Sequence, residues 1–124
     1  MKNLLPLLLL LACSCSYDSR EKDDPTPVAD TTIHYGVTIK PIITMYCTGT
    51  GAQRCHVSNS NQGSPGDFTT YTDLKAKVDA GLIKSRVFDD GGGMPPAYSE
   101  GPKALTADDL AKFKMWVKQG APEN

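Results

Sequence analysis

The chain has 124 residues, which is enough for one domain of ordinary size. Hydrophobic residues make up 40% of it and charged residues 22%, as in a typical globular protein. The formal net charge is −1, so charge gives no indication of binding to nucleic acid or to an acidic membrane surface.

The start of the chain has the pattern of an export signal. Lys2 supplies a positive charge, and the apolar run that follows over residues 4–11 is too short to cross a bilayer as a helix. The run ends in Leu-Leu-Ala-Cys at positions 10–13, which resembles the lipobox of bacterial lipoproteins. The resemblance implies a signal peptide over residues 1–12 and a lipid on Cys13. We therefore expect a membrane-anchored lipoprotein of the cell envelope, facing the periplasm or the cell surface.

Two alternatives remain for this part of the chain. An ordinary signal peptide cut nearby would leave the Cys13 thiol incidental, and Cys15 is a rival position for the lipid. Ala12 favours Cys13, because it stands where a lipobox ending at Cys15 would need a large apolar residue. Residues 13–30 are polar and contain two prolines, which predicts a flexible, lipid-anchored linker with a reach of roughly 20 Å.

Residues 31–124 are predicted to form one all-α domain, because no segment shows the sustained alternation of a strand. Helical segments are expected over residues 38–45, 71–80 and 82–88. Thr70 is a suitable N-cap for the second of these, and Gly81 suits its end. A domain of this size has a thin core, and a disulfide, a metal or a cofactor often stabilises such domains.

The last predicted helix has the clearest signals. Thr106 is a favourable N-cap, and acidic residues follow it in the first turn, where the helix dipole favours them. Apolar residues then recur at helical spacing: Leu110, Phe113 and Val117. Gly120 predicts the end of the helix. The large aromatic residues are expected mainly to pack in the core: Trp116, Phe113, Tyr71 and Phe68.

The residues most able to carry chemistry lie in the segment CTGTGAQRCH, residues 47–56. In an exported protein, two nearby cysteines first indicate a disulfide. His56 directly after Cys55 changes this interpretation, because C-x-x-C-H is the attachment signature of haem c. In that signature two thiols add to the haem vinyl groups and the histidine becomes the proximal iron ligand. Here seven residues separate the cysteines, so attachment through Cys47 stays open, whereas the Cys-His pair is intact.

Further motifs follow in a defined order along the domain. They are Ile39-Lys40-Pro41-Ile42-Ile43, Cys55-His56, Gly81-Leu82-Ile83, Met94-Pro95-Pro96, Trp116-Val117 and Gly120-Ala121-Pro122. In this order and spacing, residues 38–124 resemble the bacterial class I-like cytochrome c domain, in particular the small lipoprotein cytochromes of Bacteroidetes-type bacteria. The resemblance implies one covalently bound haem c, an all-α fold in which the first and last helices pack together, and electron transfer.

The resemblance also implies the iron ligands. His56 is the proximal ligand, and Met94 is the expected ligand on the opposite face, in a loop of three glycines followed by two prolines. Met94 could instead fill a gap in the packing, as methionine often does. Its rivals as the iron ligand are His34, Met45 and Met115.

Together these residues predict a mono-haem c-type cytochrome that exchanges electrons with redox proteins of the cell envelope and is not an enzyme. One alternative is a haem-free binding or structural lipoprotein with a disulfide between Cys47 and Cys55. A second is a haem enzyme or sensor with an open iron site. A third is a zinc site from these cysteines, His56 and His34.

Arg54 is a candidate partner for a haem propionate, with a solvated surface position as its alternative.

Overall fold

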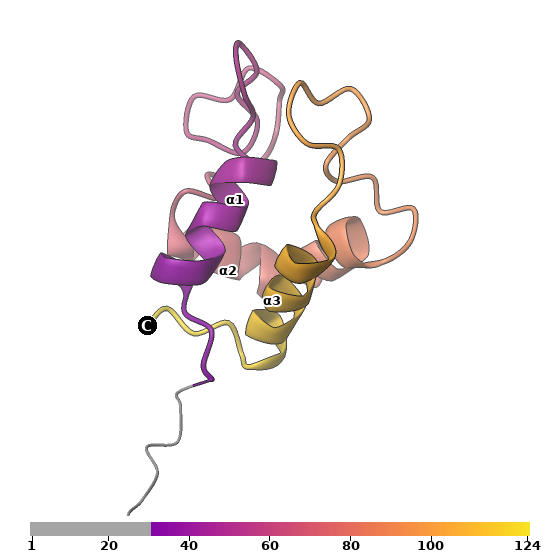
Figure 1. Ribbon diagram of the computed structural model, residues 1–124. Helices are drawn as coiled ribbons and strands as arrows, with labels where there is room; N and C mark the ends of the chain where they lie inside the picture. The colour runs from indigo at the N-terminus through magenta and orange to yellow at the C-terminus, as the bar shows by residue number, and fades with distance from the viewer. Residues whose placement is uncertain (1–30) are drawn as a thin grey trace, which may run out of the picture.

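The computed structural model describes residues 31–124 (Figure 1). Its helical elements in chain order are η1 (Tyr35–Ile39), α1 (Lys40–Tyr46), α2 (Tyr71–Asp79), η2 (Lys84–Phe88) and α3 (Ala107–Lys118), where η marks a π-helical turn. No strand occurs within this part of the chain, which confirms the all-α prediction for it. The predicted signal peptide, the lipidated Cys13 and the linker at residues 13–30 lie outside the described residues.

The helices begin and end close to where local sequence signals place them. The Thr70 side chain accepts a hydrogen bond from the Asp73 N–H at 3.3 Å, and the Thr106 side chain accepts one from the Asp109 N–H at 3.1 Å. Both predicted N-caps are therefore confirmed. The first helical segment starts earlier than predicted, because the wide turn η1 precedes α1 and runs directly into it.

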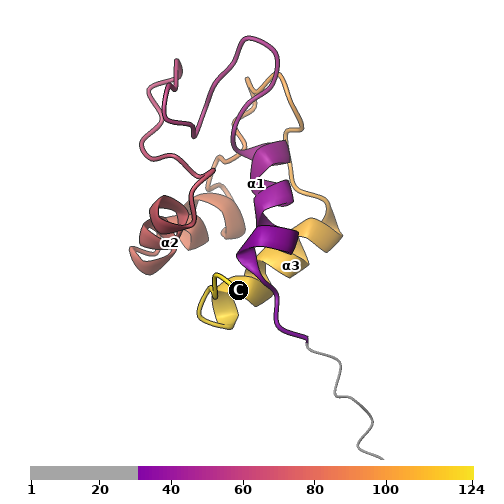
Figure 2. The ribbon, with the colours of Figure 1, turned by 90° about the vertical axis from the view of Figure 1, so that its left-hand side faces the viewer.

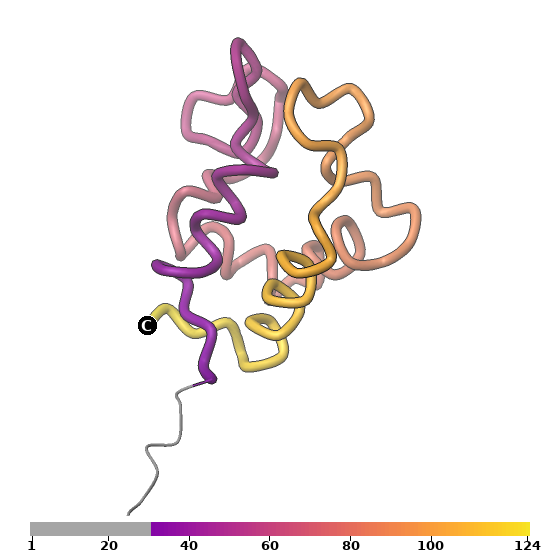
Figure 3. Tube along the Cα trace, viewed as in Figure 1, coloured from indigo at the N-terminus to yellow at the C-terminus, as the bar shows by residue number. Residues whose placement is uncertain are grey.

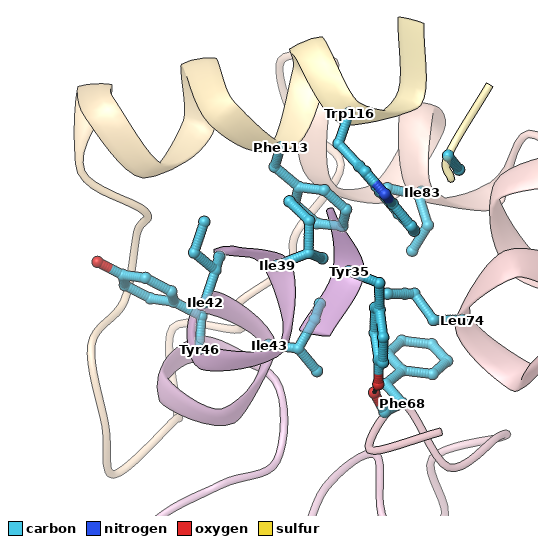
Figure 4. Close-up of a cluster of buried hydrophobic side chains, with 11 residues drawn as sticks. Tyr35, Ile39, Ile42, Ile43, Tyr46, Phe68, Leu74, Ile83, Phe113 and Trp116 are labelled. Carbon is cyan, nitrogen blue, oxygen red and sulfur yellow. Dashed lines mark hydrogen bonds between the residues drawn. The ribbon is translucent and has the colours of Figure 1, made fainter. Parts of the chain in front are cut away.

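The core lies where α3 crosses η1 and α1 (Figure 4). Its largest fully buried side chains are Trp116, Phe113, Ile39, Ile43 and Leu74. The Phe113 and Trp116 rings lie 5.9 Å apart, and Phe88 of η2 meets Phe113 edge to face at 5.1 Å. The first and last helical segments thus pack together, and η2 joins them through an aromatic contact.

The residues after α3 fold back against the core. The Trp116 indole N–H donates to the Pro122 carbonyl at 2.8 Å, and the Tyr71 hydroxyl donates to the Ala121 carbonyl at 2.9 Å. Ala121 is fully buried in the left-handed region, with φ of 54°. The Tyr35 N–H donates to the Glu123 carbonyl at 3.1 Å, so the two ends of the domain meet.

A polar joint connects α1 with the start of α3. The Tyr46 hydroxyl donates to Asp109 Oδ2 at 2.8 Å, and the Thr106 hydroxyl donates to the same oxygen at 2.7 Å. These bonds, first from Thr106 and then from Tyr46, lower the pKa of the Asp109 carboxyl, because they stabilise its ionised form.

Two long loops extend beyond the same end of the helices. One joins α1 to α2 and the other joins η2 to α3, and both views place them away from the C-terminus (Figures 1 and 2). The tube shows how each loop leaves the helical part and returns to it (Figure 3). Within residues 31–124, no helix is both long enough and apolar enough to cross a membrane.

The joint at Asp109 predicts a pH-dependent contribution to stability. A lowered folded-state pKa stabilises the fold above the ordinary pKa of an aspartate, and this contribution is lost as the pH falls through the folded-state pKa. We expect Asp109→Asn to be less stable than the parent at pH 6, with a difference that shrinks as the pH approaches 2. Urea unfolding of both proteins at several pH values measures this, and a constant difference would contradict the role of the charge.

Candidate functional site

The loop between the two cysteines is closed at its base by backbone hydrogen bonds. The Cys55 N–H donates to the Thr48 carbonyl at 2.9 Å, and the His56 N–H donates to the Cys47 carbonyl at 3.0 Å. We call this pair of bonds the neck. Gly49, with φ of 88°, permits the tight return above it, because a Cβ there would overlap the Gln53 carbonyl. The inserted residues 48–54 therefore project outward, while both cysteines remain next to the end of α1.

A cavity of about 290 Å³ lies beside the neck, between the two long loops, α2 and η2. Its volume is near the lower end of the range for ligand pockets. All four residues predicted to hold a haem line it: Cys47, Cys55, His56 and Met94. Apolar side chains make most of the remaining wall: Tyr46, Phe68, Leu82, Ile83, Val87, Pro95, Pro96 and Leu105. The structure thus brings two thiols, an imidazole and a thioether to one largely apolar space.

The imidazole of His56 is held by two neighbours. Its Nδ1 lies 3.3 Å from the Pro65 carbonyl oxygen, and because a carbonyl only accepts, Nδ1 carries the proton in this bond. The Phe68 ring stacks on the imidazole with centroids 4.0 Å apart and planes 3° from parallel. This arrangement fixes the ring and leaves Nε2 as the nitrogen that can bind a metal.

Burial keeps the histidine neutral. Desolvation lowers the pKa of His56, the hydrogen bond to Pro65 opposes this shift, and the positive charge of Lys77 adds to it. At neutral pH the side chain is therefore an uncharged imidazole, which is the form that ligates iron.

The two cysteines are free thiols rather than a disulfide. Burial, followed by the nearby Cys55, raises the pKa of the Cys47 thiol to about 12. Cys47 is therefore a protonated thiol in the wall of the cavity at neutral pH.

Met94 lies in an arch, residues 94–100, that lines part of the cavity. The Met94 N–H donates to the Arg86 carbonyl of η2 at 3.0 Å. Gly92, just before the arch, lies so close to η2 that a Cβ there would be 2.5 Å from the Arg86 carbonyl oxygen. The start of the arch is thus pressed against η2, and only glycine fits at this contact.

Two basic side chains line the cavity, and the sequence interpretation did not name them. They are Lys77 of α2 and Arg86 of η2. Each follows a buried residue by three positions, Leu74 and Ile83 respectively, and helical spacing from these core residues is the signal that points to them.

Arg54, the predicted propionate partner, is exposed and does not line the cavity, because it belongs to the projecting loop.

The rival iron ligands lie elsewhere. Met45 and Met115 are exposed by 55% and 45%, and neither lines the cavity, nor does His34. The zinc alternative is wrong for residues 31–124, in which no group of three or more His, Cys, Asp or Glu side chains could hold a metal ion. The reason is distance: the twelve residues of η1 and α1, about 18 Å of helix, separate His34 from Cys47.

The tight contact at Gly92 is open to test by substitution. We expect Gly92→Ala to lower the free energy of unfolding by about 1–3 kcal/mol, because the new methyl group overlaps the backbone of η2. Gly36→Ala is the control, since the nearest atom to its Cβ would be 3.6 Å away. Chemical denaturation measures both variants, and equal midpoints would mean that the arch does not press on η2.

Comparison with known proteins adds no assignment to this geometry. No family model, no curated protein and no solved structure matches the chain. The function is therefore inferred from the residues that line the cavity and from the motifs that the sequence contains.

Proposed function

We propose that this protein is a mono-haem c-type cytochrome that transfers electrons at the cell envelope. One observation carries the proposal: Cys47, Cys55, His56 and Met94 line a single cavity, although Met94 lies far from the others in sequence. Two thiols next to an imidazole form the donor set of covalent haem attachment, and a thioether from another loop supplies a second axial ligand.

The charge and polarity of the cavity support the same ligand. Its wall is mostly apolar and includes Lys77 and Arg86, whereas none of the described residues that line it is Asp or Glu. Such a space favours a largely apolar molecule with carboxylate groups. Haem c has this chemistry, with an apolar ring and two propionates.

The proposal gives a task to eight of the lining residues. Cys55, and Cys47 where it also reacts, would hold the haem through thioether bonds, while His56 Nε2 and the Met94 sulfur would bind the iron. Pro65 and Phe68 fix the plane of the imidazole, and Lys77 and Arg86, which line the cavity, would pair with the propionates. A haem held here would supply one-electron exchange between Fe(II) and Fe(III). The apolar wall excludes water and so helps to set the potential.

The location and partners form part of the same proposal. The lipobox-like segment ending at Cys13 supports attachment to a membrane, and the polar residues after it would let the domain turn near that surface. The partners are then other redox proteins of the envelope, which a tethered cytochrome meets by diffusion along the membrane.

Covalent haem is the first prediction. The mature protein, produced in a host that attaches haem c, should keep haem on a denaturing gel, seen by peroxidase staining and by intact mass. Cys47→Ser should keep the haem through Cys55 alone and shift the pyridine haemochrome band, because one vinyl group then remains unsaturated. Cys55→Ser should lower the covalent haem per protein more than Cys47→Ser does, because Cys55 is the proposed principal attachment. A parent protein without a Soret band would refute the proposal, and a high-spin spectrum would favour the enzyme or sensor alternative.

The sixth ligand gives another prediction. Oxidised parent protein should show the weak long-wavelength band of sulfur-to-iron charge transfer, and Met94→Ala should abolish it, admit added imidazole and lower the potential. The potential falls because a thioether favours Fe(II). Met115→Ala is the control, since that side chain is exposed on α3 and lies outside the cavity. The assignment fails if the band survives Met94→Ala.

A further inference from the structure

The projecting loop between the cysteines reaches the arch that carries Met94. The Gln53 side-chain amide donates from Nε2 to the Tyr98 carbonyl at 3.2 Å, and its Oε1 accepts from the Glu100 N–H at 2.8 Å. One side chain therefore makes hydrogen bonds on both sides of Ser99, which is itself buried and lines the cavity. The two loops are thus joined by the Gln53 side chain of one loop and two backbone groups of the other.

The same contact has close packing around it. A Cβ at Gly51 would lie 2.7 Å from a Glu100 carboxylate oxygen, and one at Gly101 would lie 3.2 Å from the Thr50 methyl carbon. The projecting loop is also braced on its other side, because the Asn61 side chain donates to the Ala52 carbonyl at 2.8 Å. The backbone next to Gln53 is thus held in place by the Asn61 hydrogen bond and by the close packing at Gly51.

The arch is consequently held at both ends. Met94 is bonded to η2 through the Arg86 carbonyl, and residues 98–100 are bonded to Gln53. Between these two attachments lie residues that line the same cavity as His56. The backbone that carries Met94 is therefore held on both sides of these cavity-lining residues.

We propose that the seven-residue loop between Cys47 and Cys55 is a clasp, and that Gln53 is a positioning residue that holds the Met94 arch over the cavity. This inference rests on the proposed haem site. It gives a function to the residues that separate this chain from the compact C-x-x-C-H signature: the insertion adds a second attachment for the loop that bears the sixth ligand.

The test uses the full holoprotein and three variants. Gln53→Ala removes both hydrogen bonds to the arch, whereas Gln53→Glu keeps the acceptor for the Glu100 N–H and loses the donor to Tyr98. Thr48→Ala is the matched control, because it lies in the same loop but its hydroxyl donates to the Thr44 carbonyl of α1, at 2.8 Å, and not to the arch. The measurements are the charge-transfer band, the dissociation constant for added imidazole, and covalent haem per protein.

In Gln53→Ala we expect imidazole to bind about tenfold more tightly than in the parent, a factor within reach of two neutral hydrogen bonds. The charge-transfer band should weaken, while covalent haem per protein stays the same. Gln53→Glu should give a smaller change in the same direction, and Thr48→Ala should match the parent. Loss of thermal stability alone, with imidazole affinity unchanged, is the result of a merely structural role and would overturn the clasp.

The outcomes separate the two proposals. A parent protein without covalent haem overturns both of them. Haem that is attached as expected, with imidazole affinity equal in Gln53→Ala and Thr48→Ala, overturns the clasp alone. Where Gln53→Ala does not accumulate as holoprotein, Gln53→Glu decides, and it must bind imidazole more tightly than Thr48→Ala for the clasp to stand.

Discussion

The backbone of His56 is held at the end of α1, because its N–H donates to the Cys47 carbonyl in the neck. The position of the cavity wall that contains both cysteines and His56 depends on this bond. This bond fixes the backbone position of His56, and the Phe68 ring and the Pro65 carbonyl fix the plane of its imidazole. It also makes the length of the insertion compatible with the site. Residues 48–54 leave and re-enter at adjacent points, so the five residues in excess of the two in C-x-x-C-H need not separate the groups that line the cavity.

The two walls of the cavity differ in how they are stabilised. The wall with the cysteines and histidine continues α1, which follows directly on η1, and η1 is buried against α3 through Ile39 and Phe113. The arch that forms another wall contains no helix and few buried apolar groups, and hydrogen bonds to η2 and to Gln53 hold it. Segments with few buried contacts open most readily. The wall with the cysteines and histidine is therefore expected to be the more stable one, and the arch is the wall that substitutions affect most directly.

Local features were predictable from sequence, and long-range ones were not. Thr70 and Thr106 could be placed as caps because their partners are three residues away. The two cysteines, the histidine and the methionine could be selected because their motifs are short. Lys77 and Arg86 could be placed near the core by their spacing from Leu74 and Ile83, but that spacing does not indicate that a cavity lies beside them. The partners of Gln53 lie 45 and 47 residues away, and no local pattern indicates such a contact.

The meeting of the domain ends has a consequence for handling the protein. Tyr35 bonds to Glu123, and this junction lies at the opposite end of the molecule from the two long loops (Figures 1 and 2). An affinity tag, a fluorophore or an electrode linker joined at Asn124 is therefore remote from the loops around the cavity. Immobilised through that residue, the domain would present those loops outward to whatever diffuses past the support.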